Sequence, residues 1–190
     1  MTGSLIKIPL YQLDADKLAE LQAAYPNAEL SLDLNQTDNV VILGEQGFWE
    51  YINLLDWTAS NDEDIIRPVV EALAKQSVRI IFEFADILSM KLFQLDRQAI
   101  AQNIGRDAWQ PQQYFSVDGF LYARACIIAN GKAVFDQTLA DPAQTLKDLT
   151  FEALLYIPSK AYQLKTGSAY DYIPAYPIET YANAKCWELS

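Results

Sequence analysis

Apolar side chains recur at helical spacing from Gly47 onward, and this periodicity restricts the possible folds more than any other feature. The longest stripe follows Ser77, a residue type that often caps a helix N-terminus. Further helices are predicted after Ser116 and over residues 150–166. We expect residues 47–167 to form a mainly α, bundle-like helical domain. The members of the longest stripe, predicted to face the core, are Val78, Phe82, Ala85, Leu88, Leu92 and Phe93.

The first 46 residues have a different pattern. Residues 5–11 predict a short strand, and Asp14 is a candidate N-cap for the helix that follows. Residues 28–34 alternate apolar with polar or acidic side chains, as a half-buried strand does. Residues 40–43 are a short apolar run that predicts another strand. We therefore expect a small acidic β-α-β extension over residues 1–46, which makes the chain α+β overall.

Residues 168–190 are rich in aromatic side chains and contain two prolines, which disfavour a long helix. The many aromatic rings also disfavour a free tail, because packing them on the protein removes a large apolar surface from water. We expect an irregular C-terminal segment packed on the helices by its rings. These aromatic residues are Tyr170, Tyr172, Tyr176, Tyr181 and Trp187.

The negative charge is concentrated in the first third of the chain. Residues 1–65 contain two basic and twelve acidic side chains, a balance of −10, whereas residues 66–190 contain 12 and 13. Such asymmetry can steer a cationic partner. The alternative is a solvated acidic surface that only aids solubility. Our candidate partner-binding residues are Asp33, Asp38, Glu45, Asp56, Asp62, Glu63 and Asp64.

The chain has no histidine and two cysteines, Cys126 and Cys186. This composition excludes a Ser-His-Asp triad, a Cys-His dyad and any zinc site that contains histidine. The glycines fit neither a phosphate loop nor a dinucleotide fingerprint, so we expect no cofactor and no metal. A net charge of −11 disfavours direct nucleic-acid binding, because phosphates need a cationic surface. Cys126 lies among apolar residues and is predicted to be a buried free thiol.

No apolar run is long enough to span a membrane, and the first residues lack the pattern of a secretory signal. We therefore expect a cytoplasmic protein without membrane contact. The sequence leaves the oligomeric state open.

Two groups of side chains are candidates for ligand binding. Ser116, Asp118 and Arg124 lie at the start of a predicted helix and within it. They suit either a capped helix with a paired arginine or an anion site at the helix N-terminus. Glu83 and Asp86 are three residues apart on one helix, so they can share a proton or bind a metal. The alternative is that each pairs with a cation from a neighbouring helix.

Several short segments of the sequence resemble motifs of a known family, the domain-of-unknown-function family numbered 4240. Residues 48–52, Phe-Trp-Glu-Tyr-Ile, resemble its opening motif, and Ser116-x-Asp118-Gly119-Phe120 with Arg124 resembles its most specific block. Val117 stands where the family usually has an aspartate. The resemblance covers about residues 47–167 and implies a helical fold and a bacterial source, without an established activity. Its remaining blocks are Gly131-Lys132, Ala140-Asp141-Pro142, Glu152-x-Leu154-Leu155-Tyr156, Ala161-Tyr162 and Thr166-Gly167.

These observations favour a non-enzymatic bacterial interaction protein. In its sharper form it is an immunity protein that neutralises a basic toxin through the acidic first third. The alternative is a ligand-binding regulator, or an enzyme, that uses the region of Ser116, Asp118 and Arg124. A structural role in an oligomer is a third hypothesis.

Overall fold

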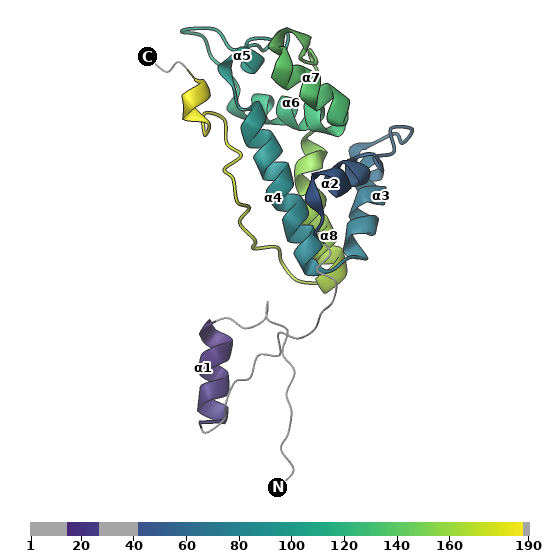
Figure 1. Cartoon of the computed structure of the whole chain (residues 1–190), viewed down its shortest axis with the longest axis vertical. Coiled ribbons are helices and arrows are strands. Elements are labelled where there is room, and N and C mark those ends of the chain that lie inside the picture. The colour runs from purple at the N-terminus through teal and green to yellow at the C-terminus, as the bar shows by residue number, and fades with distance from the viewer. Residues whose placement is uncertain (1–14, 27–41, 188–190) are drawn as a thin grey trace. The chain divides into compact units, whose positions relative to one another are not determined.

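The computed structural model describes residues 15–26 and 42–187, and the chain divides into two compact units, residues 1–40 and 41–190 (Figure 1). The described part of the first unit is one helix, α1 (Ala15–Ala24), at the position expected after Asp14. The strands predicted over residues 5–11 and 28–34 lie outside the described residues.

The described residues contain no strand, so the predicted β-α-β extension finds no support in them. The prediction of a strand over residues 40–43 is wrong at Leu43. Its backbone has helical angles, φ −59° and ψ −47°, and it leads directly into the next helix. Its N–H donates to the Glu83 carboxylate at 2.8 Å, where a strand would bond to a neighbouring carbonyl.

The described part of the second unit, residues 42–187, is helical wherever it has regular structure, which confirms the mainly α prediction. Its α-helices are α2 (Gly44–Ile52), α3 (Asp62–Ala74), α4 (Val78–Leu95), α5 (Gln98–Ala101), α6 (Val117–Ala129), α7 (Lys132–Ala140) and α8 (Ile157–Thr166). Its short 3₁₀ turns are η2 (Pro142–Gln144), η3 (Glu152–Tyr156) and η4 (Ala184–Cys186).

Each of the three longest helices in the described residues has a polar N-cap residue, and the sequence analysis predicts two of these caps. The Ser77 and Ser116 hydroxyls accept the N–H groups of Ile80 and Gly119, at 3.4 and 3.0 Å. Asn61 caps α3 by accepting the N–H of Asp64. Each cap satisfies a backbone donor that has no partner inside its helix.

The core forms around α4 and α6, which pack on each other. α4 also packs against α2, α3 and α8, while α6 packs against α7 and η3. Residues on nearly every side of α6 are buried, from Phe120 to Ala129, as expected for a helix surrounded by other elements.

The helix predicted over residues 150–166 is divided in two. Residues 152–156 form the 3₁₀ turn η3, and α8 begins at Ile157 with Pro158 in its first turn. Proline has no N–H to continue a preceding helical ladder, but it suits a helix start. Gly167, with φ +71°, ends α8 as predicted.

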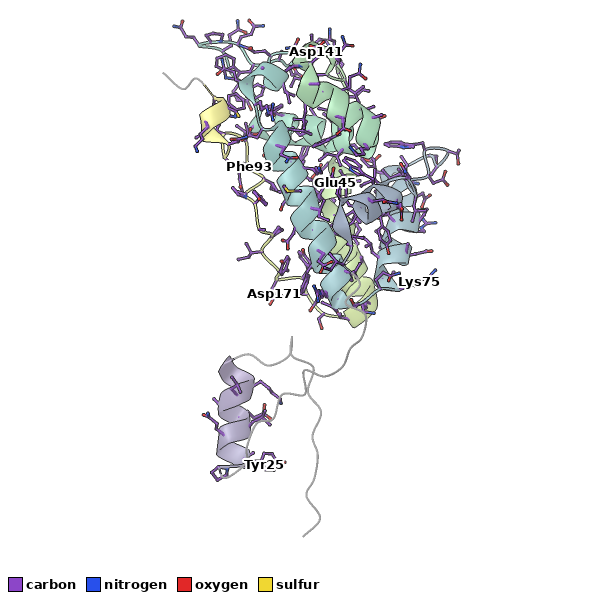
Figure 2. The ribbon with its side chains drawn as sticks, in the orientation of Figure 1. Tyr25, Glu45, Lys75, Phe93, Asp141 and Asp171 are labelled. Carbon is purple, nitrogen blue, oxygen red and sulfur yellow. The ribbon has the colours of Figure 1, made fainter. Side chains whose placement is uncertain are left out.

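We call residues 168–187 the C-terminal strap. It has no α-helix or strand, and it runs from the end of α8 back along α4 toward α5 (Figure 1). Phe82 and Phe93 of α4 are only half-buried, against the prediction that they face the core. They contact strap tyrosines instead, and Figure 2 shows Phe93 on the side of α4 along which the strap runs.

Candidate functional site

Glu45, an acidic candidate on α2 that Figure 2 labels, is paired with a buried cation. Its Oε1 accepts from Lys91 Nζ at 2.7 Å and from the Trp49 indole at 3.3 Å. The Lys91 side chain is 5% exposed and that of Glu45 is 48% exposed. The Nζ also lies 4.8 Å from the centroid of the Phe135 ring. The hydrogen bond from Lys91 lowers the pKa of Glu45 below its usual 4.5, as expected for a carboxylate in an ion pair between α2 and α4.

The acidic candidates of α3 lie together at its first turn, where they favour the helix dipole. Asp64 pairs with Arg67 on the same helix. Glu63 pairs with Lys160 of α8 at 2.8 Å. Asp62 is exposed and belongs to none of the ion pairs found among the described residues. Asp62 is therefore the member of this cluster most available to a partner.

The other acidic candidates are divided between a turn and the undescribed region. Asp56 Oδ1 accepts both the hydroxyl and the N–H of Thr58, at 2.5 and 3.0 Å, and these bonds lower its pKa. Asp33 and Asp38 lie outside the described residues. The structure thus groups Asp62, Glu63 and Asp64 at one helix end, whereas Glu45 is paired with Lys91 of α4.

A small pocket of about 240 Å³ lies beside Ser116. Asp118 and Arg124 do not line it, and Asp118 is exposed. Asp148, at its edge, accepts the N–H of Arg106 at 2.8 Å, which is the main reason that its pKa is lowered. The three residues of the predicted constellation therefore do not converge. The pocket lining is Ile104, Arg106, Asp107, Ser116, Gly119, Phe120, Ala123, Asp148, Leu149 and Thr150.

Arg124 of α6 is fully buried and bonds to neutral oxygens. Its Nη1 donates to the carbonyl of Leu92 at 3.0 Å. Its Nη2 donates to the carbonyl of Ile178 at 2.9 Å and to the Thr180 hydroxyl at 3.1 Å. Burial lowers the pKa of Arg124 to about 10, so the guanidinium stays protonated at neutral pH. Arg124 thus joins α4 and α6 to the strap.

Asp96, at the C-terminal end of α4, is a second fully buried charge that our sequence analysis misses. Its Oδ1 accepts the Tyr181 N–H at 3.2 Å and the Trp187 indole at 3.0 Å. Its Oδ2 accepts the Asn183 N–H at 2.8 Å. Neither Asp96 nor Arg124 belongs to an ion pair among the described residues, although the Asp96 charge acts on Arg124 through space. An aspartate after an apolar helix carries no signal that would distinguish it from an ordinary helix end.

Glu83 and Asp86 of α4 hold different segments. Glu83 bonds to Leu43 as described above and pairs with Arg79 at 2.7 Å. Asp86 accepts the Tyr172 hydroxyl and the Ala175 N–H, both at 2.8 Å. Glu83 therefore holds the residue that precedes α2, and Asp86 holds the strap.

Residues 43–164 match the family described as "Protein of unknown function (DUF4240)". The chain belongs to this family. No curated protein and no solved structure matches the chain significantly.

The DUF4240 region contains Asp86, Asp96 and Arg124 as well as the pocket beside Ser116. It ends before Gly167, so the strap that these three residues hold lies outside it. The family match thus separates the anchoring residues from the segment that they anchor.

Other reactive features in the described part of this DUF4240 protein are few. Cys126 is buried and free, and burial raises its pKa to about 11, which keeps the thiol protonated. Cys186 is also free. Across residues 15–26 and 42–187, no cluster of three metal-ligating side chains occurs. No helix in the same ranges has the length and apolar character that a membrane span requires.

Proposed function

We propose that this DUF4240 protein is a non-enzymatic bacterial interaction protein that binds a basic protein partner in the cytoplasm. In its sharper form, it is an immunity protein that neutralises a basic toxin. The supporting observation is the balance of −10 over residues 1–65. A concentration of like charge raises the association rate with a partner of opposite charge.

The bonding of the candidate catalytic groups also favours a non-enzymatic role. Glu83 is held by Arg79 and the Leu43 N–H, while Asp86 is held by the strap. Arg124 is buried among backbone carbonyls. These groups maintain the fold, whereas Asp62 and Glu63 are exposed at the surface.

Co-purification of the tagged full chain from its native host, followed by mass spectrometry, tests the proposal. We expect a stoichiometric basic partner whose association slows as salt is added. Neutralising Asp62→Asn with Glu63→Gln should slow association by roughly three- to tenfold at low salt. The matched control is Asp171→Asn, an exposed carboxylate outside the first third. An acidic partner, no partner, or equal effects of the two variants would contradict the proposal.

The alternative function, a ligand-binding regulator or an enzyme, has one observation in its favour. This is the pocket beside Ser116, which contains charged residues from two loops. A screen of small-molecule fragments by NMR tests it. Saturable chemical-shift changes at Gly119 and Thr150 would favour ligand binding, and their absence across the library would count against it.

A further inference from the structure

Side chains of α4 and α6 bind the main chain of the strap at several levels. We call Asp86, Ser89, Asp96 and Arg124 the anchor face. Ser89 accepts the N–H of Tyr176 at 3.3 Å, which adds to the bonds described above. The main-chain groups held by the anchor face are the N–H groups of Ala175, Tyr176, Tyr181 and Asn183 and the carbonyl of Ile178.

Contacts of this kind suit an extended polypeptide. Backbone N–H and carbonyl groups are the same in every sequence, so they supply affinity, while pockets for side chains supply selectivity. The anchor face offers two carboxylates and a hydroxyl to N–H groups and a guanidinium to a carbonyl. The anchor face therefore binds a peptide backbone through side chains, and not through the edge of a β-sheet.

The most buried anchors depend almost entirely on the strap. Asp96 and Arg124 are both 0% exposed. Of the side-chain hydrogen bonds that these two residues make within the described residues, only the bond from Arg124 to the Leu92 carbonyl does not involve the strap. Two charges left in the core without these partners are strongly disfavoured. The anchor face thus favours an occupant that offers N–H groups to Asp96 and a carbonyl to Arg124.

Aromatic contacts add selectivity along the strap. Tyr172 stacks on Phe82 with ring centroids 4.1 Å apart, and Tyr176 contacts Phe93 at 5.6 Å. Trp187 packs against Phe120 with centroids 5.8 Å apart. The rest of the strap lies at the surface: among its described residues, Trp187 alone is buried. A segment held by a few rings and by its backbone is suited to exchange.

We propose that the anchor face is a polypeptide-binding site of the DUF4240 domain, and that the strap is its built-in ligand. The partner is a protein with an extended, aromatic-rich segment that replaces the strap. The family match supports this division, because it includes the anchor face and ends before the strap. This proposal is independent of the basic partner proposed above, since it uses other residues.

A full chain that is cut between Gly167 and Ser168 tests this site. A protease recognition sequence can be inserted there, because both residues are exposed and the space around Gly167 is open. The probe is a fluorescent synthetic peptide of residues 168–190, followed by anisotropy under reducing conditions. We expect saturable binding to the cut protein. The intact chain should bind the peptide at least about tenfold more weakly, because its tethered strap competes at a high effective concentration.

Matched variants separate recognition from nonspecific adhesion. A peptide with Tyr172→Ala and Tyr176→Ala should lose binding. The control peptide carries Asp171→Ala and Ile173→Ala, and should bind like the original, because both side chains are exposed, Ile173 by 87%. In the protein, Asp86→Asn should weaken binding about tenfold, as expected for a hydrogen bond to a charged group. Within the described residues, the hydrogen bonds of the Asp86 side chain go to the strap, so this change spares the helices.

Several results would overturn the proposal. One is a cut protein that excludes the labelled peptide even in excess, with its helical circular dichroism intact. Another is equal binding of the two variant peptides. A cut protein that unfolds and does not refold with added peptide would show that the anchor face is not a preformed site. A stable dimer of intact chains with exchanged straps would assign the face to a second copy.

Discussion

Lys91 and Arg124 are both buried cations of the helical core, but their partners differ. Lys91 bonds to the half-exposed carboxylate of Glu45 and lies against aromatic rings. Arg124 bonds to two carbonyls and a hydroxyl, two of them on the strap. An ammonium is a compact point charge, whereas the planar guanidinium presents several donors in a fixed geometry. The lysine therefore stabilises a single contact between α2 and α4, and the arginine joins α4 and α6 to the strap.

Replacing Arg124 should produce the largest effect of this comparison. Arg124→Met leaves the oxygens of Leu92, Ile178 and Thr180 without their donor and Asp96 without a nearby positive charge. We expect a loss of about 3–5 kcal/mol in the free energy of unfolding, because two carbonyls each lose a hydrogen bond to a charged group, at about 1.5–3 kcal/mol each. Urea denaturation followed by circular dichroism measures it.

Arg124→Lys is the matched control, because it keeps the charge but cannot reach all three acceptors. It should destabilise the protein less than Arg124→Met. If the methionine variant is as stable as the parent, the buried guanidinium contributes no net stability and the contrast with Lys91 fails.

Asp96→Asn should give the next largest loss. The amide keeps one acceptor oxygen, but its NH₂ group then faces an N–H donor of the strap. We expect a loss of about 2 kcal/mol, in the range for a hydrogen bond to a buried charge. Thermal and urea unfolding measure this loss. The comparison with Asp86→Asn is informative, since Asp86 is only half-buried and should matter less. Equal effects would mean that burial does not distinguish the two anchors.

Tyr172→Phe should cost about 1 kcal/mol near neutral pH, because it removes the hydroxyl that donates to Asp86. Burial and this hydrogen bond raise the pKa of Tyr172 to about 12. The stabilisation is therefore complete below pH 10 and is lost as the pH rises toward 12. Stability measured across this range should converge for the variant and the parent.

Tyr170→Phe is the control for this prediction. The Tyr170 hydroxyl is buried without a hydrogen-bond partner among the described residues, so its removal should cost nothing. A loss as large as that of Tyr172→Phe would contradict the role given to Asp86.

Lys91→Met should have a smaller effect than Tyr172→Phe, less than about 1 kcal/mol at neutral pH, because Glu45 is exposed enough to be solvated alone. The methionine retains packing against Trp49 and Phe135. The lowered pKa of Glu45 means that the ion pair contributes above pH 4.5 and that this contribution is lost as the pH falls through the folded pKa. The difference between variant and parent should therefore shrink in acid, measured by unfolding at each pH. A difference that grows in acid would contradict this sign.

The sequence predicts those parts of the fold that depend on local patterns. Ser77, Ser116 and Gly167 mark helix ends because caps are determined by neighbouring residues. The predicted helix over residues 150–166 is divided before Pro158, because proline has no N–H to continue a helix. Our prediction does not apply this local rule.

The anchors could not be predicted in the same way. Phe82 and Phe93 fit a core stripe, but the strap covers them from a distant part of the sequence. An acidic partner is the ordinary expectation for a buried arginine, yet Arg124 uses carbonyls, and every residue has a carbonyl. Asp96 becomes special only when the strap brings three donors to it. Long-range pairing of this kind leaves no periodic signal.

The strap has a consequence for hydrogen exchange. The N–H groups of Ala175, Tyr176, Tyr181 and Asn183 bond to side chains, although they belong to no α-helix or strand. Slow amide exchange would therefore extend into a segment that secondary structure alone would mark as unprotected. Since Asp86, Ser89 and Asp96 provide the acceptors, the exchange rate of each amide reports on one anchoring residue. The opening of this segment can then be followed contact by contact in the native protein.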